Sequence, residues 1–484
     1  MSSSGFLAVG LDLGTSGLKA VALDELGHCV ARARVDYPTS QSEPAAAEQD
    51  PADWVDACHR AVGELASHTD PARWHAVGLS AMLPTLVSLD PRGLPIGVAS
   101  TWQDGRAEPD GKHIASALGP EVIYRSTGQR FDGRYLVAMH SRRVRLGLVP
   151  RESMVAGAKD YLFSVLTGEL LTDPSTAAGY GAYDLQRADW DETILAEASV
   201  SAVPQVLPSI ASRPLRDELA SEWGCPAGIP VFLGVADSVA GAYGLGVRGP
   251  GPIAYIAGTS NVILGRSAAL RFDERGRFLV TPMEDSSFGM EMDLLSTGSA
   301  VKWLTSVLGL TGPKQLGELA ATAELTSAPL VLPFLSPGEQ GALWDPELCG
   351  AIEGMTLRTT RAELARGLLA GIVAESLRCI DVLAQETSRK DPILLTGSGA
   401  IAGVFRRDLA DATGRDVHFN RNEHDHSALG AALLAGHQAL GWDSELPPNG
   451  DIDIVAPDPR RAELWTHRFA QHDSLCRSQQ DRRR

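Results

Sequence analysis

Residues 11–20, LDLGTSGLKA, bring together the residue types that handle phosphate groups. Asp12 ends an apolar run, Gly14 permits a sharp turn, and Thr15 and Ser16 offer amides and hydroxyls to an anion. The spacing differs from the G-x-x-x-x-G-K-[ST] of a P-loop. An acid beside a phosphate is favourable where Mg²⁺ lies between them, because the metal neutralises both. The alternative is an ordinary hairpin whose Asp12 and Thr15 bond their own backbone.

A second segment of the same kind lies in the other half of the chain. In IAGTSNVILG, Gly258, Thr259 and Ser260 stand between two apolar runs as Gly14 to Ser16 do. One such turn is weak evidence for a phosphate site. Two turns, one in each half, would hold a polyphosphate from both sides of a cleft.

Asp237 is the candidate for acid–base chemistry. In VFLGVADSVAGAYGLG it follows an apolar strand and precedes a helix rich in small residues. An acid at a helix N-terminus is stabilised by the helix dipole, so a structural role is one interpretation. The other is a general base that faces the cleft.

A glycine pattern late in the chain suggests a competing function. Gly397, Gly399 and Ala402 fit the G-x-G-x-x-[GA] fingerprint of dinucleotide-binding folds. The next strand, in residues 415–422, lacks the acid that would hold a ribose, and no second mononucleotide-binding half follows. The match at residues 244–249 runs into Pro250. The sequence therefore disfavours an NAD-dependent dehydrogenase.

Two further groups of residues have structural as well as functional interpretations. His424, Asp425 and His426 could suggest a metal site, but alternate residues point apart on a strand. We predict instead a capping loop before the apolar helix that follows. Met82 and Trp102 follow strand-like stretches and would either line a small-molecule pocket or pack in a core.

The elements that position these residues alternate between strands and helices. Residues 6–13, 19–27 and 28–37 read as three successive strands. A helix follows over residues 50–68, with Asp50 as its cap and Pro51 in its first turn. A strand then returns at residues 74–82. A meander followed by alternating helix and strand predicts an α/β fold with a mixed sheet.

The same order returns in the second half, so we predict a duplicated fold. Residues 250–267 give strand, turn and strand, and a long helix over 359–386 begins with Thr360 and Glu363 spaced as a capping box. We expect two actin-like, ribonuclease H-like α/β domains with mixed sheets, flanking helices and a cleft between them. The predicted units are residues 1–246, 247–440 and a terminal appendage, 441–484.

Composition narrows the classes of partner. The chain has 484 residues and a formal net charge of −17, which argues against nucleic acid or an anionic membrane as partner. Six scattered cysteines without a C-x-x-C pair indicate reduced thiols, as in cytoplasm. The first residues resemble no signal peptide, and no apolar run is long enough to span a membrane.

Together these segments resemble the FGGY carbohydrate kinases of the actin-like and sugar-kinase ATPase superfamily. The resemblance runs from about residue 7 to residue 436 and is strongest to the xylulokinase branch. It includes residues 159–185, with the order K-D-Y-L…T-G-E…T-D…S-x-A-A, and residues 296–304 and 350–357. A kinase of this family transfers phosphate from ATP, with Mg²⁺, to a small sugar or polyol.

The resemblance also implies roles for individual residues. Asp12 would organise Mg²⁺ through water, and Asp237 would take the proton from the attacking sugar hydroxyl. The residues expected to contact ATP phosphates are Thr15, Ser16, Lys19, Gly258 and Thr259. The residues expected to hold adenosine are Gly298, Lys302, Gly399 and Ala400. The residues expected on the sugar side are Met82 and the W-[NQ]-D segment Trp102, Gln103 and Asp104.

Departures from the xylulokinase pattern concern the sugar side. Xylulokinases usually have Q-M-H-G where this chain has residues 80–84, SAMLP, so Leu83 replaces a hydroxyl-binding histidine. Ser238 stands where Asn is common after the catalytic acid. The first family signature is poorly kept in residues 130–140, and Ala370 replaces an acid of the second. We therefore expect a divergent member acting on a ketose such as xylulose, or on a related polyol.

Two questions stay open on the sequence alone. A catalytically inactive actin-like protein that binds ATP and regulates a partner would share the same turns, although the presence of Asp12 and Asp237 argues for catalysis. Members of the family often form homodimers, which the resemblance extends to this chain as an expectation.

Overall fold

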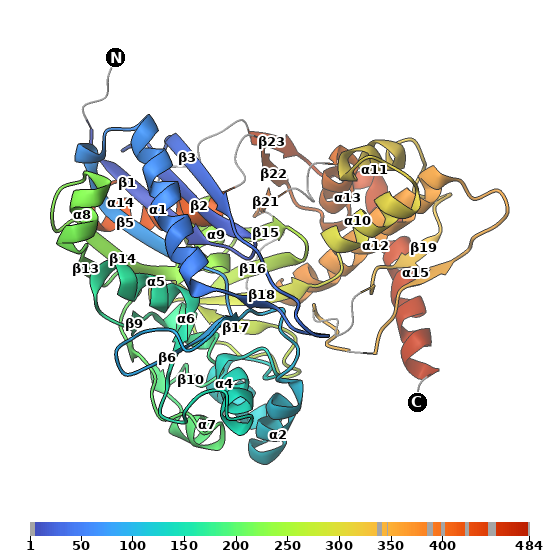
Figure 1. Cartoon of the computed structure of the whole chain (residues 1–484). Helices are drawn as coiled ribbons and strands as arrows, with labels where there is room; N and C mark the ends of the chain where they lie inside the picture. The colour runs from blue at the N-terminus through green and yellow to red at the C-terminus, as the bar shows by residue number, and fades with distance from the viewer. Residues whose placement is uncertain are drawn as a thin grey trace.

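The computed structural model describes residues 5–335, 341–345, 347–384, 391–397, 402–421, 425–443 and 452–482. Figure 1 shows two α/β halves, each built around a large mixed sheet. The first sheet has the order β13-β14-β5-β1-β2-β3 and the second the order β17-β18-β16-β15-β21-β22-β23. The predicted fold class, two α/β units with mixed sheets and flanking helices, is confirmed.

The strands fall at the apolar runs of the sequence. The first sheet contains β1 (Leu7–Leu13), β2 (Gly17–Leu23), β3 (Cys29–Asp36), β5 (Trp74–Ala81), β13 (Ser212–Pro214) and β14 (Pro230–Ala236). The second contains β15 (Ile253–Ala257), β16 (Asn261–Ser267), β17 (Leu279–Pro282), β18 (Phe288–Leu294), β21 (Ile393–Thr396), β22 (Val417–Asn420) and β23 (Ile452–Val455).

Smaller strands and the helices complete the chain. A four-stranded sheet consists of β4 (Glu48–Gln49), β7 (Ala99–Ser100), β6 (Leu86–Leu89) and β8 (Met154–Gly157). Three further strand pairs are β9 (Leu171–Thr172) with β12 (Gln205–Val206), β10 (Tyr183–Asp184) with β11 (Asp189–Trp190), and β19 (Leu330–Leu332) with β20 (Ala351–Glu353). The α-helices are α1 (Pro51–His68), α2 (Glu108–Leu118), α3 (Pro120–Thr127), α4 (Leu136–Arg145), α5 (Ala158–Thr167), α6 (Pro174–Ala178), α7 (Glu192–Glu197), α8 (Asp217–Trp223), α9 (Asp237–Leu245), α10 (Gly298–Val307), α11 (Pro313–Ala320), α12 (Arg361–Leu383), α13 (Gly403–Thr413), α14 (His426–Leu440) and α15 (Pro459–Asp481).

The two sheets repeat one connection pattern. In the first, β1 pairs antiparallel with β2 and parallel with β5, and β5 pairs parallel with β14. In the second, β15 pairs antiparallel with β16 and parallel with β21, and β21 pairs parallel with β22. The duplication predicted from the paired turns is therefore present in the strand pairing.

Local sequence signals set the helix ends as expected. The Asp50 carboxylate accepts a hydrogen bond from the Ala52 amide at 2.9 Å and begins α1. Thr360 and Glu363 form the predicted capping box of α12, in which each side chain accepts the other's backbone N–H. These interactions occur within one turn of helix, which is why the sequence alone predicts them.

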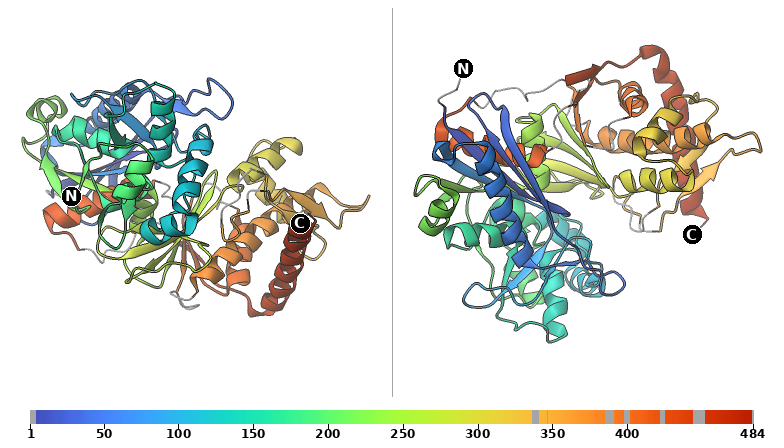
Figure 2. Two further views of the ribbon diagram at one scale, coloured as in Figure 1. Left: turned by 90° about the horizontal axis from the view of Figure 1, so that it is seen from below. Right: turned by 45° about the horizontal axis from the view of Figure 1, so that its top comes forward.

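Helices α9 and α14 lie between the sheets. Helix α14 packs on β1 and β5 of the first sheet, and α9 contacts both β14 and β15 (Figures 1 and 2). Helices α1 and α5 cover the other face of the first sheet. Helix α14 thus belongs to the core of the first sheet, although it falls within the predicted second unit, residues 247–440.

The start of α14 differs in detail from the expected capping loop. Asp425 occupies the cap position, but its Oδ1 lies 3.5 Å from Nζ of Lys19 and its side chain makes no cap hydrogen bond. An ion pair between Asp425 and Lys19 of β2 thus takes the place of a local cap hydrogen bond. His424 lies outside the described residues.

Residues 452–482, which fall in the expected appendage 441–484, pack against the second half. Strand β23 pairs antiparallel with β22 at the sheet edge, and α15 packs against α12 and α13. The buried side chains of α15 are Trp465, Arg468, His472 and Cys476, one narrow stripe at helical spacing. Arg468, His472 and Cys476 are polar or only weakly apolar, so the composition of this segment did not reveal a buried helix face.

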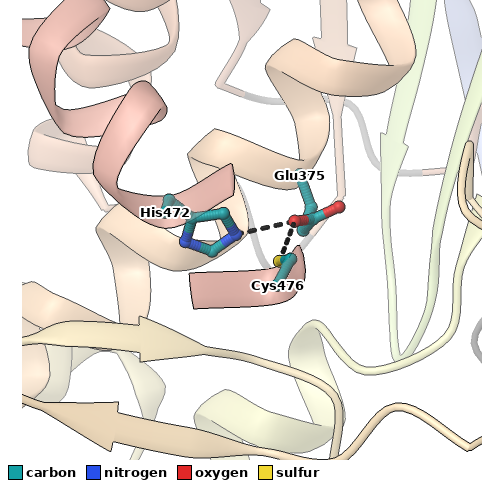
Figure 3. Close-up of side chains that lie close together, drawn as sticks. All are labelled: Glu375, His472 and Cys476. Carbon is teal, nitrogen blue, oxygen red and sulfur yellow. Dashed lines mark hydrogen bonds and ion pairs between the residues drawn. The ribbon is translucent and has the colours of Figure 1, made fainter. Parts of the chain in front are cut away.

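Glu375 of α12 connects α12 to α15 through a cluster of buried polar side chains (Figure 3). Nε2 of His472 lies 2.6 Å from Oε1 of Glu375, and the Cys476 thiol lies 3.8 Å from the same oxygen. The Arg378 guanidinium donates to the other oxygen at 3.0 Å. These donor types also bind metals, but Glu375 is already occupied by Arg378 and His472, so we interpret the cluster as a packing contact.

The charges in this cluster fix the protonation of Glu375. Burial raises the pKa of this carboxyl, but the charge of Arg378 and the hydrogen bond from His472 outweigh burial and hold the pKa at about 2.

All six cysteines of the chain are free thiols. Within the ranges that the structure describes, no helix has the length and apolar character needed to cross a bilayer.

We predict that Glu375→Ala destabilises the fold by about 3 kcal/mol, because it removes the carboxylate partner of buried His472 and leaves half-buried Arg378 with Asp473 alone. Denaturant unfolding of the purified chain measures this. Arg477→Ala, at an exposed position on α15, is the control and should change stability by less than about 1 kcal/mol. Equal effects of the two substitutions would show that the cluster contributes no more than a surface pair.

The same cluster predicts a pH dependence. The pKa of Glu375 is lowered in the folded state from an ordinary 4.5 to about 2, so its contribution is present above pH 4.5 and is lost as pH falls towards 2. The stability difference between the wild type and Glu375→Ala should therefore shrink in acid. A difference that stays constant from pH 7 to pH 3 would contradict this.

Candidate active site

A cavity of about 570 Å³ lies where the two halves meet. Its walls include Thr15 and Ser16 from the β1–β2 turn, and Gly258 and Thr259 from the β15–β16 turn. Asp237, the first residue of α9, also lines it. The structure thus brings together both predicted turns and the predicted base, which lie far apart in the sequence.

The β1–β2 turn is held by contacts from several segments. The Gly14 amide donates to Gly17 O at 3.1 Å and closes the turn. The Thr15 hydroxyl accepts a hydrogen bond from the Trp102 indole at 3.0 Å, and the Thr15 carbonyl accepts one from the Gln49 side chain at 2.8 Å. These contacts fix Thr15 and connect the turn to the predicted sugar-side segment.

The β15–β16 turn is packed tightly against the start of α10. The Gly258 amide donates to Ser260 O at 3.0 Å, and the Ser299 amide donates to Thr259 O at 3.0 Å. A Cβ at Gly298 would lie 2.1 Å from Gly258 O, so only glycine fits there. Gly298 therefore positions the turn, and its role in holding adenosine stays a prediction.

The structure says less about the other residues that were predicted to hold adenosine. Lys302 lies on α10 with an exposed side chain. Gly399 and Ala400 lie outside the described residues. The structure therefore places Gly298 beside the turn but gives no contact for the remaining three.

Asp12 lies buried at the end of β1. Its Oδ1 accepts a hydrogen bond from the Ser80 hydroxyl at 3.0 Å, and its Oδ2 lies 4.0 Å from Nζ of Lys19. Burial raises the pKa of Asp12, and the Lys19 charge and the Ser80 hydrogen bond oppose that rise. Lys19 lies between Asp12 and Asp425 in this structure. A buried carboxylate with one weak cationic partner is a suitable donor for a hydrated Mg²⁺.

Asp237 follows β14 directly and presents its carboxylate to the cavity. Ala236 is the cap residue, and Asp237 lies in the first turn of α9, where the helix dipole stabilises its charge as the structural interpretation expected. Its Oδ1 accepts one hydrogen bond, from the Ser238 amide at 2.9 Å. Burial raises the pKa of Asp237 well above its usual range, and the nearby charges of Asp12 and Glu291 raise it further.

A buried network supports the backbone at Asp237. The Ser175 hydroxyl accepts a hydrogen bond from the Ala236 amide at 2.8 Å and donates to Asp173 Oδ2 at 2.5 Å. Nζ of Lys159 lies 2.9 Å from Asp173 Oδ1, and both side chains are fully buried. The sequence motif contained these residues, but only the fold places them beside Asp237.

The sugar-side predictions divide into two groups. Trp102 and Gln103 line the cavity. Asp104 is buried, and its carboxylate accepts hydrogen bonds from the Arg106 guanidinium at 2.9 and 3.1 Å. Met82 is 2% exposed and packs in the core of the first half, while its neighbour Leu83 lines the cavity.

Sequence reasoning missed the wall formed by β18. Glu291 and Asp293 line the cavity, whereas Met290, Met292 and Leu294 are buried in the core on the other face. The alternation of acids and apolar residues in 289–294, GMEMDL, indicates such a wall, because residues two apart on a strand share a face. Two acids alternating with core residues indicate a polar surface that faces a site.

Comparison with known proteins agrees with this geometry. Models of the N-terminal and C-terminal domains of the FGGY family of carbohydrate kinases match residues 7–244 and 253–439. Xylulose kinase from Klebsiella pneumoniae is 30% identical over 451 residues, covering 91% of each chain. Gluconokinase from Bacillus subtilis is 24% identical over 446 residues, covering 88% of this chain and 86% of the relative.

A solved structure shows the same arrangement. The xylulose kinase from Rhodospirillum rubrum superposes with a TM-score of 0.87 at 26% identity, covering 97% of this chain and 98% of that one. The match at residues 253–439 assigns the glycine pattern at Gly397 to a kinase domain rather than to a dinucleotide fold. The chain belongs to the FGGY family of carbohydrate kinases and resembles the xylulose kinases within it.

Proposed function

We propose that this chain transfers the terminal phosphoryl group of ATP to a hydroxyl of a ketose such as xylulose, or of a related polyol. The observation that carries the proposal is the meeting of Asp237 and both glycine-containing turns in one cavity. In the transfer, the acceptor oxygen bonds to the γ-phosphorus as the bond to the β-phosphate bridging oxygen breaks. The acceptor proton passes to Asp237, and ADP leaves.

Asp237 suits the role of proton acceptor. It lines the cavity, and one hydrogen bond from a neighbouring amide leaves acceptor capacity on the carboxylate. Burial raises its pKa, which makes the Asp237 carboxylate a stronger base than an exposed one. The network of Ser175, Asp173 and Lys159 supports its backbone, which favours a constant position relative to the acceptor.

The two turns would bind the phosphates of ATP. Thr15 and Ser16 approach the cavity from the first half, and Gly258 and Thr259 from the second. Mg²⁺ bound near Asp12 would neutralise phosphate charge during transfer. We propose that the units 1–246 and 247–440 close on both substrates and exclude water, which competes with the acceptor hydroxyl.

Asp237→Asn should lower kcat by about 10² to 10⁴-fold, because the amide cannot take the acceptor proton. Release of ADP by a coupled assay with a panel of ketoses and polyols measures kcat, and a calorimetric titration measures ATP binding. ATP affinity should stay within about threefold of the wild type. Asp217→Asn, in the exposed first turn of α8, is a control for loss of one acidic charge.

Turnover by Asp237→Asn at the wild-type rate would contradict the role of Asp237. A wild-type chain that binds ATP and releases no ADP with any acceptor would contradict the kinase proposal. That outcome would favour the inactive, ATP-binding regulatory protein instead.

Asp12→Asn should raise the Mg²⁺ concentration needed for half-maximal turnover by about tenfold, as loss of an outer ligand does in other metal sites. Turnover measured over a range of Mg²⁺ at saturating ATP and acceptor tests this. Partial recovery at high Mg²⁺ separates a binding defect from misfolding. An unchanged Mg²⁺ dependence would exclude Asp12 from the metal site.

A further inference from the structure

Strand β18 gives the cavity an acidic wall. Glu291 and Asp293 project from one face of the strand into the cavity, while Met290 and Met292 fill the core behind them. Together with Asp237, three carboxyl groups line this cavity. The proposed transfer uses only Asp237, which leaves the two acids of β18 without a role.

Glu291 is held in place by hydroxyl groups. Its Oε2 accepts hydrogen bonds from Ser238 Oγ at 3.1 Å and from Thr281 Oγ1 at 2.7 Å. Burial and the charge of Asp293 raise the pKa of Glu291, and the hydrogen bonds from Thr281 and Ser238 oppose that rise. Ser238 directly follows Asp237, so Glu291 is connected to the proposed base through one side chain.

Asp293 is half-buried, and one of its carboxylate oxygens is shielded from solvent. Among the residues that the structure describes, its Oδ1 has no hydrogen-bond partner. Burial raises the pKa of Asp293, and the charge of Arg134 opposes that rise. A buried acceptor in a cavity wall is costly unless a ligand supplies a donor.

The balance of charge in the cavity is negative. Arg134 is the single cation among the described residues of its lining. The Arg134 guanidinium already donates to Asp132, with Nε at 3.0 Å from Oδ2. Arg134 is therefore shared between Asp132 and the field of Asp293, and the three carboxyl groups of the lining outnumber its one cation among the described residues.

We propose that Glu291 and Asp293 determine the class of acceptor: an uncharged polyhydroxylated molecule is accepted and an aldonate is rejected. Sugar hydroxyls donate to carboxylates in strong, charge-assisted hydrogen bonds. A carboxylate on the acceptor would instead repel the acids of the wall in a low-dielectric cavity. The inference rests on the proposed function, and it decides between the chemistries named for the xylulose kinase and gluconokinase relatives.

Matched acceptors that differ at one carbon test the proposal. D-glucitol and D-gluconate share a six-carbon hydroxylated chain and differ only in CH₂OH against COO⁻ at one end, and xylitol and D-xylonate form a second pair. Each is measured by calorimetric binding, as an acceptor in the ADP assay, and as a competitor of the best neutral ketose. The neutral member of each pair should be favoured by about tenfold or more.

Neutral variants of the wall identify the residues responsible. The double substitution Glu291→Gln and Asp293→Asn keeps the side-chain shapes and removes both charges, so the preference for the neutral member should fall by about tenfold. Asp293→Asn alone should give an intermediate ratio and guards against a double variant that folds poorly. Glu64→Gln, which removes an exposed charge on α1, should leave the ratio unchanged.

The outcomes separate this inference from the proposed function. Equal or tighter binding of the aldonate, or an unchanged ratio in the double variant, overturns the inference even where neutral acceptors are phosphorylated. ATP binding without phosphorylation of any acceptor overturns the proposed function. In that case the calorimetric ratio still decides whether Glu291 and Asp293 select uncharged ligands.

Discussion

The close approach of α14 to the first sheet is the constraint on which the site depends. A Cβ at Gly10 would lie 2.0 Å from Ala428 O, and one at Gly78 would lie 1.9 Å from Ala431 O. On its other side, a Cβ at Gly430 would lie 1.9 Å from Ala240 O of α9. Backbone thus packs on backbone, and the two helices fit between the sheets only because these residues have no side chain.

This packing places the ends of strands from both halves around Asp237. The Ser427 hydroxyl, at the start of α14, donates to Asp237 O at 2.9 Å. The same end of the helix carries Asp425, which meets Lys19 beside Asp12. One helix therefore contacts the proposed base and the neighbourhood of the proposed metal ligand. Burial raises the pKa of both Asp12 and Asp237, and neighbouring acids raise each further, so the unliganded site favours cations and hydrogen-bond donors.

Features that depend on neighbours in the chain were predictable from the sequence. Strand alternation, the cap at Asp50, the box at Thr360 and both glycine turns were found because each is set within a few residues. Asp104 and Lys19 were placed in the site by resemblance, yet their observed partners, Arg106 and Asp425, are set by folded geometry. The stripe of α15 and the wall of β18 were missed because their partners lie in distant elements.

The order of the elements along the chain also affects how the protein reaches its native state. The first sheet begins at residue 7, but the helix that covers one face of β1 and β5 spans residues 426–440. These contacts have very high contact order, which slows folding and leaves apolar surface exposed during synthesis. The predicted boundary at residue 246 therefore separates α14 from the strands that it covers. The N-terminal half becomes complete only after almost the whole polypeptide has left the ribosome.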